Sequence, residues 1–482
     1  MNIFERIRAS EKIQAWSLGE SQISALQTLT MLKTQVRQWG TFQVRTFNRS
    51  LLSTMLTIGG LTMLVKLVAA GKETFIARQL GVGDALDAFL VAYSLPALAT
   101  SIIAGSFNSA LIPTYMQVRE QEGNQAAHRL FAGVMFWSLG LLLLISALLA
   151  LLFPLVLPYL ASGFSPEKLV FTRGLFSAVL PIVAVTGVSI TWTAVLNAEG
   201  EFALPAITPI VTSLVVTAVL LFRVQTWGVW GLAVGTSVGA CLEAALIGIR
   251  LRGRGISPLP KWRSMDATLR QVMRQYLPLA ASGLVFSGTS LADQAIAATL
   301  GAGKVATLNY GYKIIALIIS ITSTAVIISV LPHFSRLAAT GDWKGLRRDL
   351  NSYTSLILFA LVPTALLLSY FSVPLVRLVF ERGAFTAHDT RLVGHVQAWF
   401  AMQLPFYTLG LMYTRLISAL KHNDSIFIVS FISVSLNLAL DIIFARYLGV
   451  AGIALSTAVV SVAFCGTMYM LLLRALPATA KV

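Results

Sequence analysis

One pattern of glycine, proline and aromatic residues occurs twice in this chain, about 220 residues apart, inside long apolar runs. The matched pairs are Leu-Gly-Val-Gly at 80–83 with Leu-Gly-Ala-Gly at 300–303, Tyr93 with Tyr312, Pro181 with Pro405, and the glycine-containing stretches 228–233 and 449–454. The matches keep one order along the chain, which indicates an internal duplication. Many membrane transporters use duplicated halves to build a central site that opens to either side.

The composition fits a chain that lies in lipid. Of its 482 residues 56% are hydrophobic and 12% are charged, whereas soluble proteins carry about 25% charged residues. A helix needs about 20 apolar residues to cross the bilayer, and helices satisfy their own backbone hydrogen bonds there. Segments of this kind lie at about 51–72, 86–112, 131–157, 171–196, 204–222, 228–249, 274–299, 305–332, 353–379, 393–418, 425–445 and 450–474.

These segments predict an all-α polytopic membrane protein with about 12 transmembrane helices in two six-helix lobes around a central cavity. The expected parts are a cytoplasmic N-terminal extension at 1–48, an N-terminal six-helix lobe at 49–249, a basic cytoplasmic linker at 250–273, a C-terminal six-helix lobe at 274–475 and a tail at 476–482. An even number of spans in each half gives both halves the same orientation in the membrane.

The net charge of +16 is concentrated in the loops between the apolar segments, above all in the linker. Cytoplasmic loops are enriched in Lys and Arg, so we expect the linker and both termini to face the cytoplasm. A nucleic-acid binder would instead carry a basic face with aromatic residues on a soluble domain. The placement of the charges therefore argues against nucleic acid as a partner.

No catalytic or metal-binding motif stands in the sequence. Cys241 and Cys465 each lie inside an apolar segment, which favours neither a disulfide nor a metal site. P-loop, HExxH, CxxC and nucleophile-elbow patterns are all missing from the sequence. We therefore expect no enzyme activity, no metal and no cofactor.

Several charged residues fall within or beside the apolar segments, where charge is costly and usually faces a cavity or a partner. They include Lys66, Lys72, Glu73, Arg78, Asp84, Asp87, Asp293, Lys313, Arg415 and Asp441. Lys66 and Glu73 are two helical turns apart on one face, which is too far for direct contact but close enough to line one cavity. The alternative for Lys66 is a side chain that reaches the nearer interface. For Asp441, a charge pair with Arg446 at the helix end is an alternative to an inward-facing role.

A cavity lined by several cations suits an anion, and diphosphate is the obvious anionic group of membrane-embedded carriers. Lysine binds phosphate as a mobile point charge. We expect Lys66, Lys72 and Lys313 to attract it.

Three stretches carry a resemblance to a known family. Lys-Glu-Thr-Phe-Ile-Ala-Arg-Gln-Leu-Gly at 72–81, Asp-Ala-Phe-Leu-Val-Ala-Tyr at 87–93 and Phe-Glu-Arg-Gly-Ala-Phe-Thr at 380–386 resemble the MurJ/MviN family, and the similarity runs from about 50 to 474. The family belongs to the multidrug/oligosaccharidyl-lipid/polysaccharide exporter superfamily. The resemblance implies a flippase that moves an undecaprenyl-diphosphate-linked saccharide, a lipid II-like precursor of peptidoglycan, across the bacterial inner membrane by alternating access.

The resemblance also suggests roles for particular residues. The cavity arginines of the family fall at Lys66, Lys72 and Lys313, which would bind the diphosphate. Glu73, Arg78, Asp87 and Asp293 are the candidates for lining the cavity or for coupling. The loop formed by Arg382, Gly383, Ala384 and Phe385 would close the periplasmic side. Two features depart from the family: the stretch 99–101 carries no charge where the family has two arginines, and there are twelve apolar segments where fourteen are usual.

These departures leave alternatives open. The substrate is a lipid-linked saccharide, either lipid II-like or an exopolysaccharide or O-antigen repeat unit. A transport-dead membrane scaffold in polysaccharide assembly and a drug exporter of the same superfamily are the other readings. A membrane glycosyltransferase is disfavoured, because the longest internal loop has only about 25 residues. Membrane lipids are expected partners, while coupling to a proton, to sodium or to the membrane potential, and the oligomeric state, are not decided by the sequence.

Overall fold

The computed structural model describes residues 49–262, 267–420 and 422–476, and these residues form helices and loops without a strand. The extension at 1–48, part of the linker (263–266) and the tail from 477 onward lie outside the described residues. Residues 1–62 and 63–482 are two separate units. The contacts given below all lie within the second of them.

The helices follow the predicted segments. In chain order they are α3 (Arg49–Leu80), α4 (Asp84–Glu122), α5 (Asn124–Leu160), α6 (Pro166–Val179), α7 (Pro181–Ala198), α8 (Ala203–Ile207), α9 (Pro209–Trp227), α10 (Val229–Gly253), α11 (Ala267–Thr299), α12 (Lys304–Thr340), α13 (Trp343–Tyr370), α14 (Ser372–Phe380), α15 (Ala387–Ala401), α16 (Leu404–Ala419), α17 (Asn423–Leu448) and α18 (Val450–Ala475). Pro181 and Pro209 stand in the first turn of their helices, where proline needs no hydrogen-bond acceptor.

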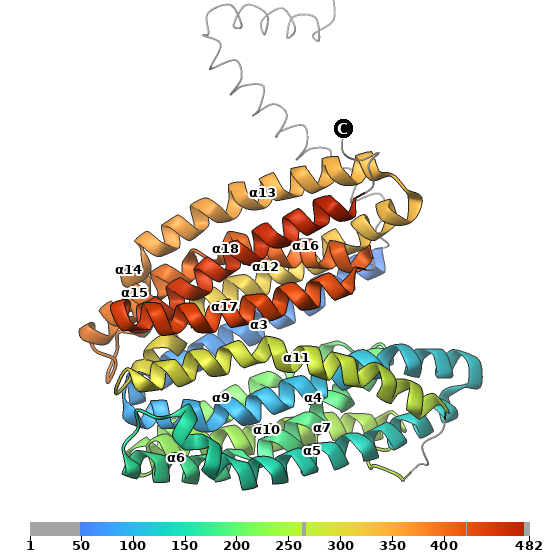
Figure 1. The fold of residues 1–482 in the computed structure, drawn as a ribbon. Coiled ribbons are helices and arrows are strands. Elements are labelled where there is room, and N and C mark those ends of the chain that lie inside the picture. The colour runs from blue at the N-terminus through green and yellow to red at the C-terminus, as the bar shows by residue number, and fades with distance from the viewer. Residues whose placement is uncertain (1–48, 263–266, 421, 477–482) are drawn as a thin grey trace, which may run out of the picture. The chain divides into compact units, whose positions relative to one another are not determined.

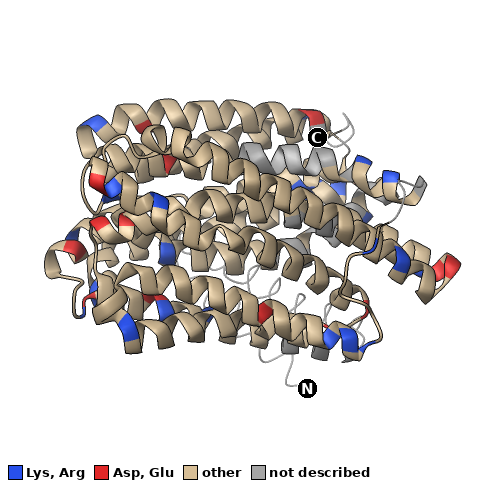
Figure 2. Ribbon diagram, turned by 90° about the horizontal axis from the view of Figure 1, so that it is seen from below, with Lys and Arg blue, Asp and Glu red and all other residues tan. Residues whose placement is uncertain are grey.

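Nine helical stretches in the described residues are long and apolar enough to cross a membrane. The predicted segment 393–418 is not among them because it is divided between α15 and α16, which have 15 and 16 residues. Large apolar side chains such as Leu151 and Phe222 are exposed along these helices, as a lipid-facing surface requires. Figure 2 shows the charged residues mostly near the helix ends.

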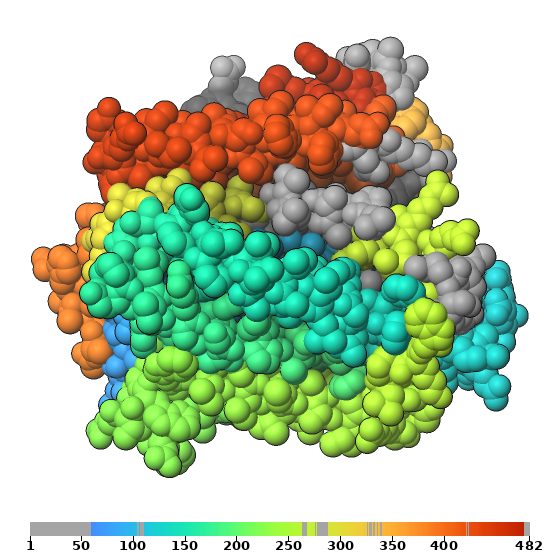
Figure 3. Space-filling model, turned by 60° about the horizontal axis from the view of Figure 1, so that its bottom comes forward, coloured from blue at the N-terminus to red at the C-terminus, as the bar shows by residue number. Residues whose placement is uncertain are grey.

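Two groups of helices pack among themselves. Helices α4, α5, α6, α7, α9 and α10 contact one another, and so do α12 to α18 (Figure 1). We call them the first and the second bundle. Helix α11 packs against α4 and α5 of the first bundle and against α17 of the second, and Figure 3 shows it between α5 and α17 on one face. The domain boundaries expected from the sequence stay a prediction.

Candidate functional site

A carboxylate held between two lysines joins α3 to the second bundle. Glu73 of α3 accepts from the ammonium group of Lys72 at 3.1 Å and from that of Lys313, on α12, at 3.1 Å. All three side chains are partly exposed, with 20% to 35% of each accessible. The sequence predicted three intramembrane charges here, and the fold brings them into one cluster.

Lys66 lies further along α3, and together with Lys72, Glu73 and Lys313 it forms what we call the lysine strip. Its ammonium group donates to the hydroxyl of Ser320 on α12 at 2.6 Å. Lys66 and Glu73 are seven residues apart on α3, and Lys313 and Ser320 are seven apart on α12. Seven residues span about 10 Å of helix, so the two antiparallel helices touch at two levels. The strip carries three lysines and one carboxylate, which leaves a positive surface for an anion.

The predicted gate loop contacts the end of α3 at one end of the helices, which we call the closed end. The backbone N–H of Ala384 donates to the carbonyl of Arg78 at 2.8 Å. Gly81 has a φ of 60°, and a Cβ there would lie 2.4 Å from the carbonyl oxygen of Ala384. Gly383 has a φ of 62°, and a Cβ there would lie 2.4 Å from the carbonyl oxygen of Arg78. Only glycine allows both the backbone conformation and the close approach.

The loop is fixed by its own neighbours. Phe385 is buried and packs edge-on against Tyr310, with ring centroids 5.6 Å apart, and against Phe380. The guanidinium of Arg382 donates to the carbonyl of Leu378 at 3.0 Å. Arg78 contributes its backbone to this closure, so the expected role for its side chain in the cavity stays a prediction.

Asp87 of α4 caps a helix of the second bundle at the closed end. Its two carboxylate oxygens accept from the N–H groups of Gly303, just before α12, and Ala306, in its first turn, each at 2.7 Å. Side-chain oxygens at this position satisfy the free N–H groups of a helix start and complement its positive dipole. Lys168 of α6 lies 3.5 Å from Asp87 and also pairs with Asp84.

An acidic pair lies where α11 meets the second bundle. Asp293 of α11 faces Asp441 of α17, and Asp441 accepts from the hydroxyl of Ser456, which in turn accepts from the amide of Asn437 at 2.8 Å. Asp441 is fully buried. The alternative of a helix-end charge pair with Arg446 does not hold, because the packing of α17 on α18 turns Asp441 inward to Ser456.

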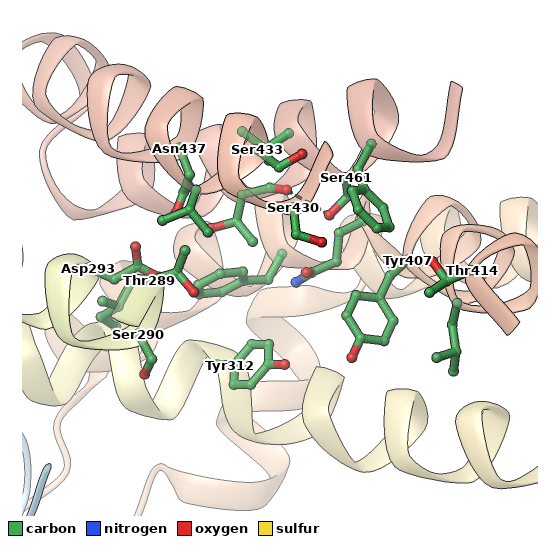
Figure 4. A pocket seen from close by; sticks show the side chains of 18 of the residues that line it. Thr289, Ser290, Asp293, Tyr312, Tyr407, Thr414, Ser430, Ser433, Asn437 and Ser461 are labelled. Carbon is green, nitrogen blue, oxygen red and sulfur yellow. Dashed lines mark hydrogen bonds between the residues drawn. The ribbon is translucent and has the colours of Figure 1, made fainter. Parts of the chain in front are cut away.

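A cavity of about 640 Å³ extends from this acidic pair through the second bundle. It lies among α11, α12, α15, α16, α17 and α18, and Figure 4 shows Asp293 at one end and Thr414 at the other, with Tyr312 and Tyr407 between them. The sequence named Asp293, Tyr312 and Arg415 of its lining and expected Asp293 to line a central cavity, but it did not place a cavity among these helices.

Glu243 is a carboxylate that the sequence reasoning missed. It lies near the middle of α10, inside a candidate span, and accepts from the hydroxyl of Thr212 on α9 at 2.9 Å. The signal was available, since Glu243 is an acid within the predicted segment 228–249. Lys168 is a second residue that the sequence reasoning missed. It lies in the first turn of α6, where a lysine is ordinary, so only the structure shows its contact with Asp87.

Comparison with known proteins now decides the family. Residues 76–481 match the family described as lipid II flippase MurJ. This chain belongs to the MurJ family. The probable lipid II flippase MurJ of Rhizobium tropici is 29% identical over 419 residues, which cover 85% of this chain and 78% of that protein. The lipid II flippase MurJ of Burkholderia cenocepacia is 26% identical over 369 residues, covering 74% and 70%.

Solved structures support the same fold. A lipid II flippase MurJ in an inward closed conformation superposes with a TM-score of 0.74 at 20% identity, covering 88% of both chains. An inward-facing multidrug resistance MATE family transporter of the MOP superfamily gives 0.72 at 13% identity, covering 89% of this chain and 99% of that one. The resemblance and the all-helical membrane fold inferred from the sequence are confirmed, and the chain is a multi-pass membrane protein of a transporter family.

Proposed function

We propose that this protein is a flippase for an undecaprenyl-diphosphate-linked saccharide, with lipid II as the leading substrate, in the bacterial inner membrane. Lys66, Lys72 and Lys313 bind the diphosphate, and the prenyl tail stays in lipid. Membership of the MurJ family supports the substrate class. The observation that carries the assignment to these residues is the position of Glu73 between Lys72 and Lys313, because an internal carboxylate marks the place where an external anion is attracted.

Alternating access would open and close the two ends of the bundles in turn. The contacts of Arg78 and Gly81 with the loop at 382–385 support a gate at the closed end. We infer that this end faces the periplasm and that both termini face the cytoplasm, since the basic linker belongs to the opposite side.

The test of the binding residues is charge reversal at two lysines. Lys66→Glu combined with Lys313→Glu should lower flipping of lipid II in proteoliposomes by at least about tenfold, because two attractive contacts to the diphosphate become repulsive. The matched control is Lys261→Glu with Lys344→Glu, two exposed positions. Wild-type flipping by the first double variant would exclude the lysine strip as the binding site.

Expression in bacteria depleted of their own lipid II flippase decides between the substrates. Rescue supports lipid II. Rescue only of a strain that lacks an exopolysaccharide or O-antigen flippase moves the substrate to a polysaccharide repeat unit. Failure in both strains, with the protein present in the membrane, favours the scaffold reading.

Coupling is proposed to run through Asp293 and Asp441. Each has a buried carboxylate oxygen without a hydrogen-bond partner in the part of the chain that the structure describes. Two adjacent carboxylates in a membrane interior need a proton or a cation between them, and oxygen ligands suit sodium. Asp293→Asn should abolish the dependence of flipping on whichever sodium or proton gradient drives the wild type. A wild-type response to the gradient in this variant would exclude Asp293 from coupling.

A further inference from the structure

The cavity in the second bundle is built for a ligand larger than an ion. Its volume of about 640 Å³ lies within the range of about 300–1,000 Å³ of small-molecule pockets. None of the three lysines lines it among the described residues. The charged residues of its lining are Asp293 and Arg415, so a ligand here is recognised by residues other than the three lysines.

The lining combines hydroxyl groups with aromatic rings. Ser430, Ser433 and Thr289 present hydroxyls, while Tyr312 and Tyr407 present rings with a hydroxyl at the edge (Figure 4). Rings pack on the apolar faces of a ligand, and hydroxyls exchange hydrogen bonds with its edge. A prenyl tail would leave the hydroxyls without partners, so the lining disfavours a purely apolar occupant.

Two side-chain amides supply the decisive detail. The buried Oε1 of Gln294 on α11 and the buried Nε2 of Gln403, just before α16, both line the cavity and have no hydrogen-bond partner in the regions that the structure describes. Gln403 is 2% exposed. A buried unpaired polar atom costs about 1–3 kcal/mol, so such atoms point to a missing partner. One is an acceptor and one a donor, which are the two roles that a ligand hydroxyl fills.

We propose that this cavity binds the saccharide of the lipid-linked substrate while the lysine strip holds its diphosphate. The proposal rests on the proposed flippase function. Tyr312 lines the cavity and the next residue of α12, Lys313, belongs to the lysine strip, so one turn of helix presents both surfaces. A saccharide linked directly to a diphosphate needs this adjacency. Gln294 and Gln403 are specificity-determining residues, and Tyr407 supplies a ring face.

The test compares two ligands on the purified full-length protein in nanodiscs. Lipid II and sugar-free undecaprenyl diphosphate are titrated against the wild type and the variants. The wild type should bind lipid II more tightly. Gln294→Leu combined with Gln403→Leu should weaken binding of lipid II by about tenfold, since two hydrogen bonds to the sugar are lost, and leave binding of undecaprenyl diphosphate unchanged.

Gln397→Leu is the matched control. Gln397 is also buried with both amide atoms unpaired in the described part of the chain, and it belongs to the same bundle, but it does not line the cavity. The affinity of the Gln397→Leu variant for both lipids should equal that of the wild type. Leucine fills the volume of glutamine and removes an unpaired amide, so all three substitutions should leave the thermal unfolding temperature unchanged or higher.

Each outcome separates the saccharide site from the flippase function. If the double glutamine variant keeps the wild-type preference for lipid II, or if the wild type has no preference, the saccharide site is wrong while diphosphate binding stands. Lys313→Gln should weaken the binding of both lipids by the same factor. If the wild type binds neither lipid, the proposed substrate class fails and the saccharide site fails with it.

Discussion

Glu73 acts at the scale of single residues as an internal counterion. It pairs with the ammonium groups of Lys72 and Lys313, with which the diphosphate of the proposed substrate would have to pair instead. Glu73→Gln should therefore bind undecaprenyl diphosphate about tenfold more tightly, because the substrate no longer displaces a charged partner, and should release it more slowly, so that flipping falls. Equilibrium binding and proteoliposome flipping measure the two effects.

Glu201→Gln is the control for that change. Glu201 also bridges two cations, Arg250 and Arg254, but it does so in the loop before α8. Its loss should leave affinity and flipping as they are. An unchanged affinity for the diphosphate in Glu73→Gln would show that Glu73 does not compete with the substrate.

The charged residues of this site could be predicted from the sequence, but their pairing could not. Lys72, Glu73 and Lys313 stand out because charge is rare in apolar segments. That Glu73 bonds Lys313 depends on the packing of α3 beside α12, which no local pattern specifies. Arg78 shows the same limit, since its contact with Ala384 is made by its backbone.

At the scale of helices, the cap on α12 comes from a residue 216 positions away from its first donor. Asp87→Ala should destabilise the closed state by about 0.5–2 kcal/mol, the cost of losing such a cap. The variant should therefore spend more time in conformations in which α4 and the start of α12 are apart. Spin labels at Ala85 and Ala302, with Cys241 replaced, should give a longer and broader distance distribution.

The matching control removes a cap that does not link the bundles. Asp342 caps α13 by accepting from the N–H of Gly345 at 2.9 Å, inside the second bundle. Asp342→Ala should lower stability by a similar amount without moving the two labels. Identical distances in Asp87→Ala and the wild type would mean that the cap does not govern closure.

The helices themselves were within reach of the sequence. Runs of apolar residues gave all twelve segments, and prolines such as Pro181 mark where a run is divided into two helices. The cap on α12 could not be predicted from the sequence, because Asp87 resembles any acidic residue in the first turn of a helix, here α4. The cavity in the second bundle was also hidden, since its lining comes from several helices that are distant in sequence.

At the scale of the whole molecule, the proposed alternating access requires the closed end to open and close, and the close approach of Gly81 to Ala384 fits a gate there. Gly81→Ala would push a methyl group to 2.4 Å from the carbonyl of Ala384, so the gate at 382–385 could not seat. Gly449→Ala is the matched control, because Gly449 has nearly the same φ, 59° against 60°, but nothing within 4 Å of an added Cβ. A positive φ is unfavourable for alanine, so both variants bear backbone strain at the substituted residue.

Only the Gly81 variant should lose function. Gly81→Ala should reach the membrane and melt within a few degrees of Gly449→Ala, yet lose flipping of lipid II, since a transporter that cannot close one end cannot alternate. Gly449→Ala should keep nearly full flipping. If both variants flip lipid II at the same rate, the close approach of Gly81 to the loop is not required for transport. Closure must then depend on the cap at Asp87 instead.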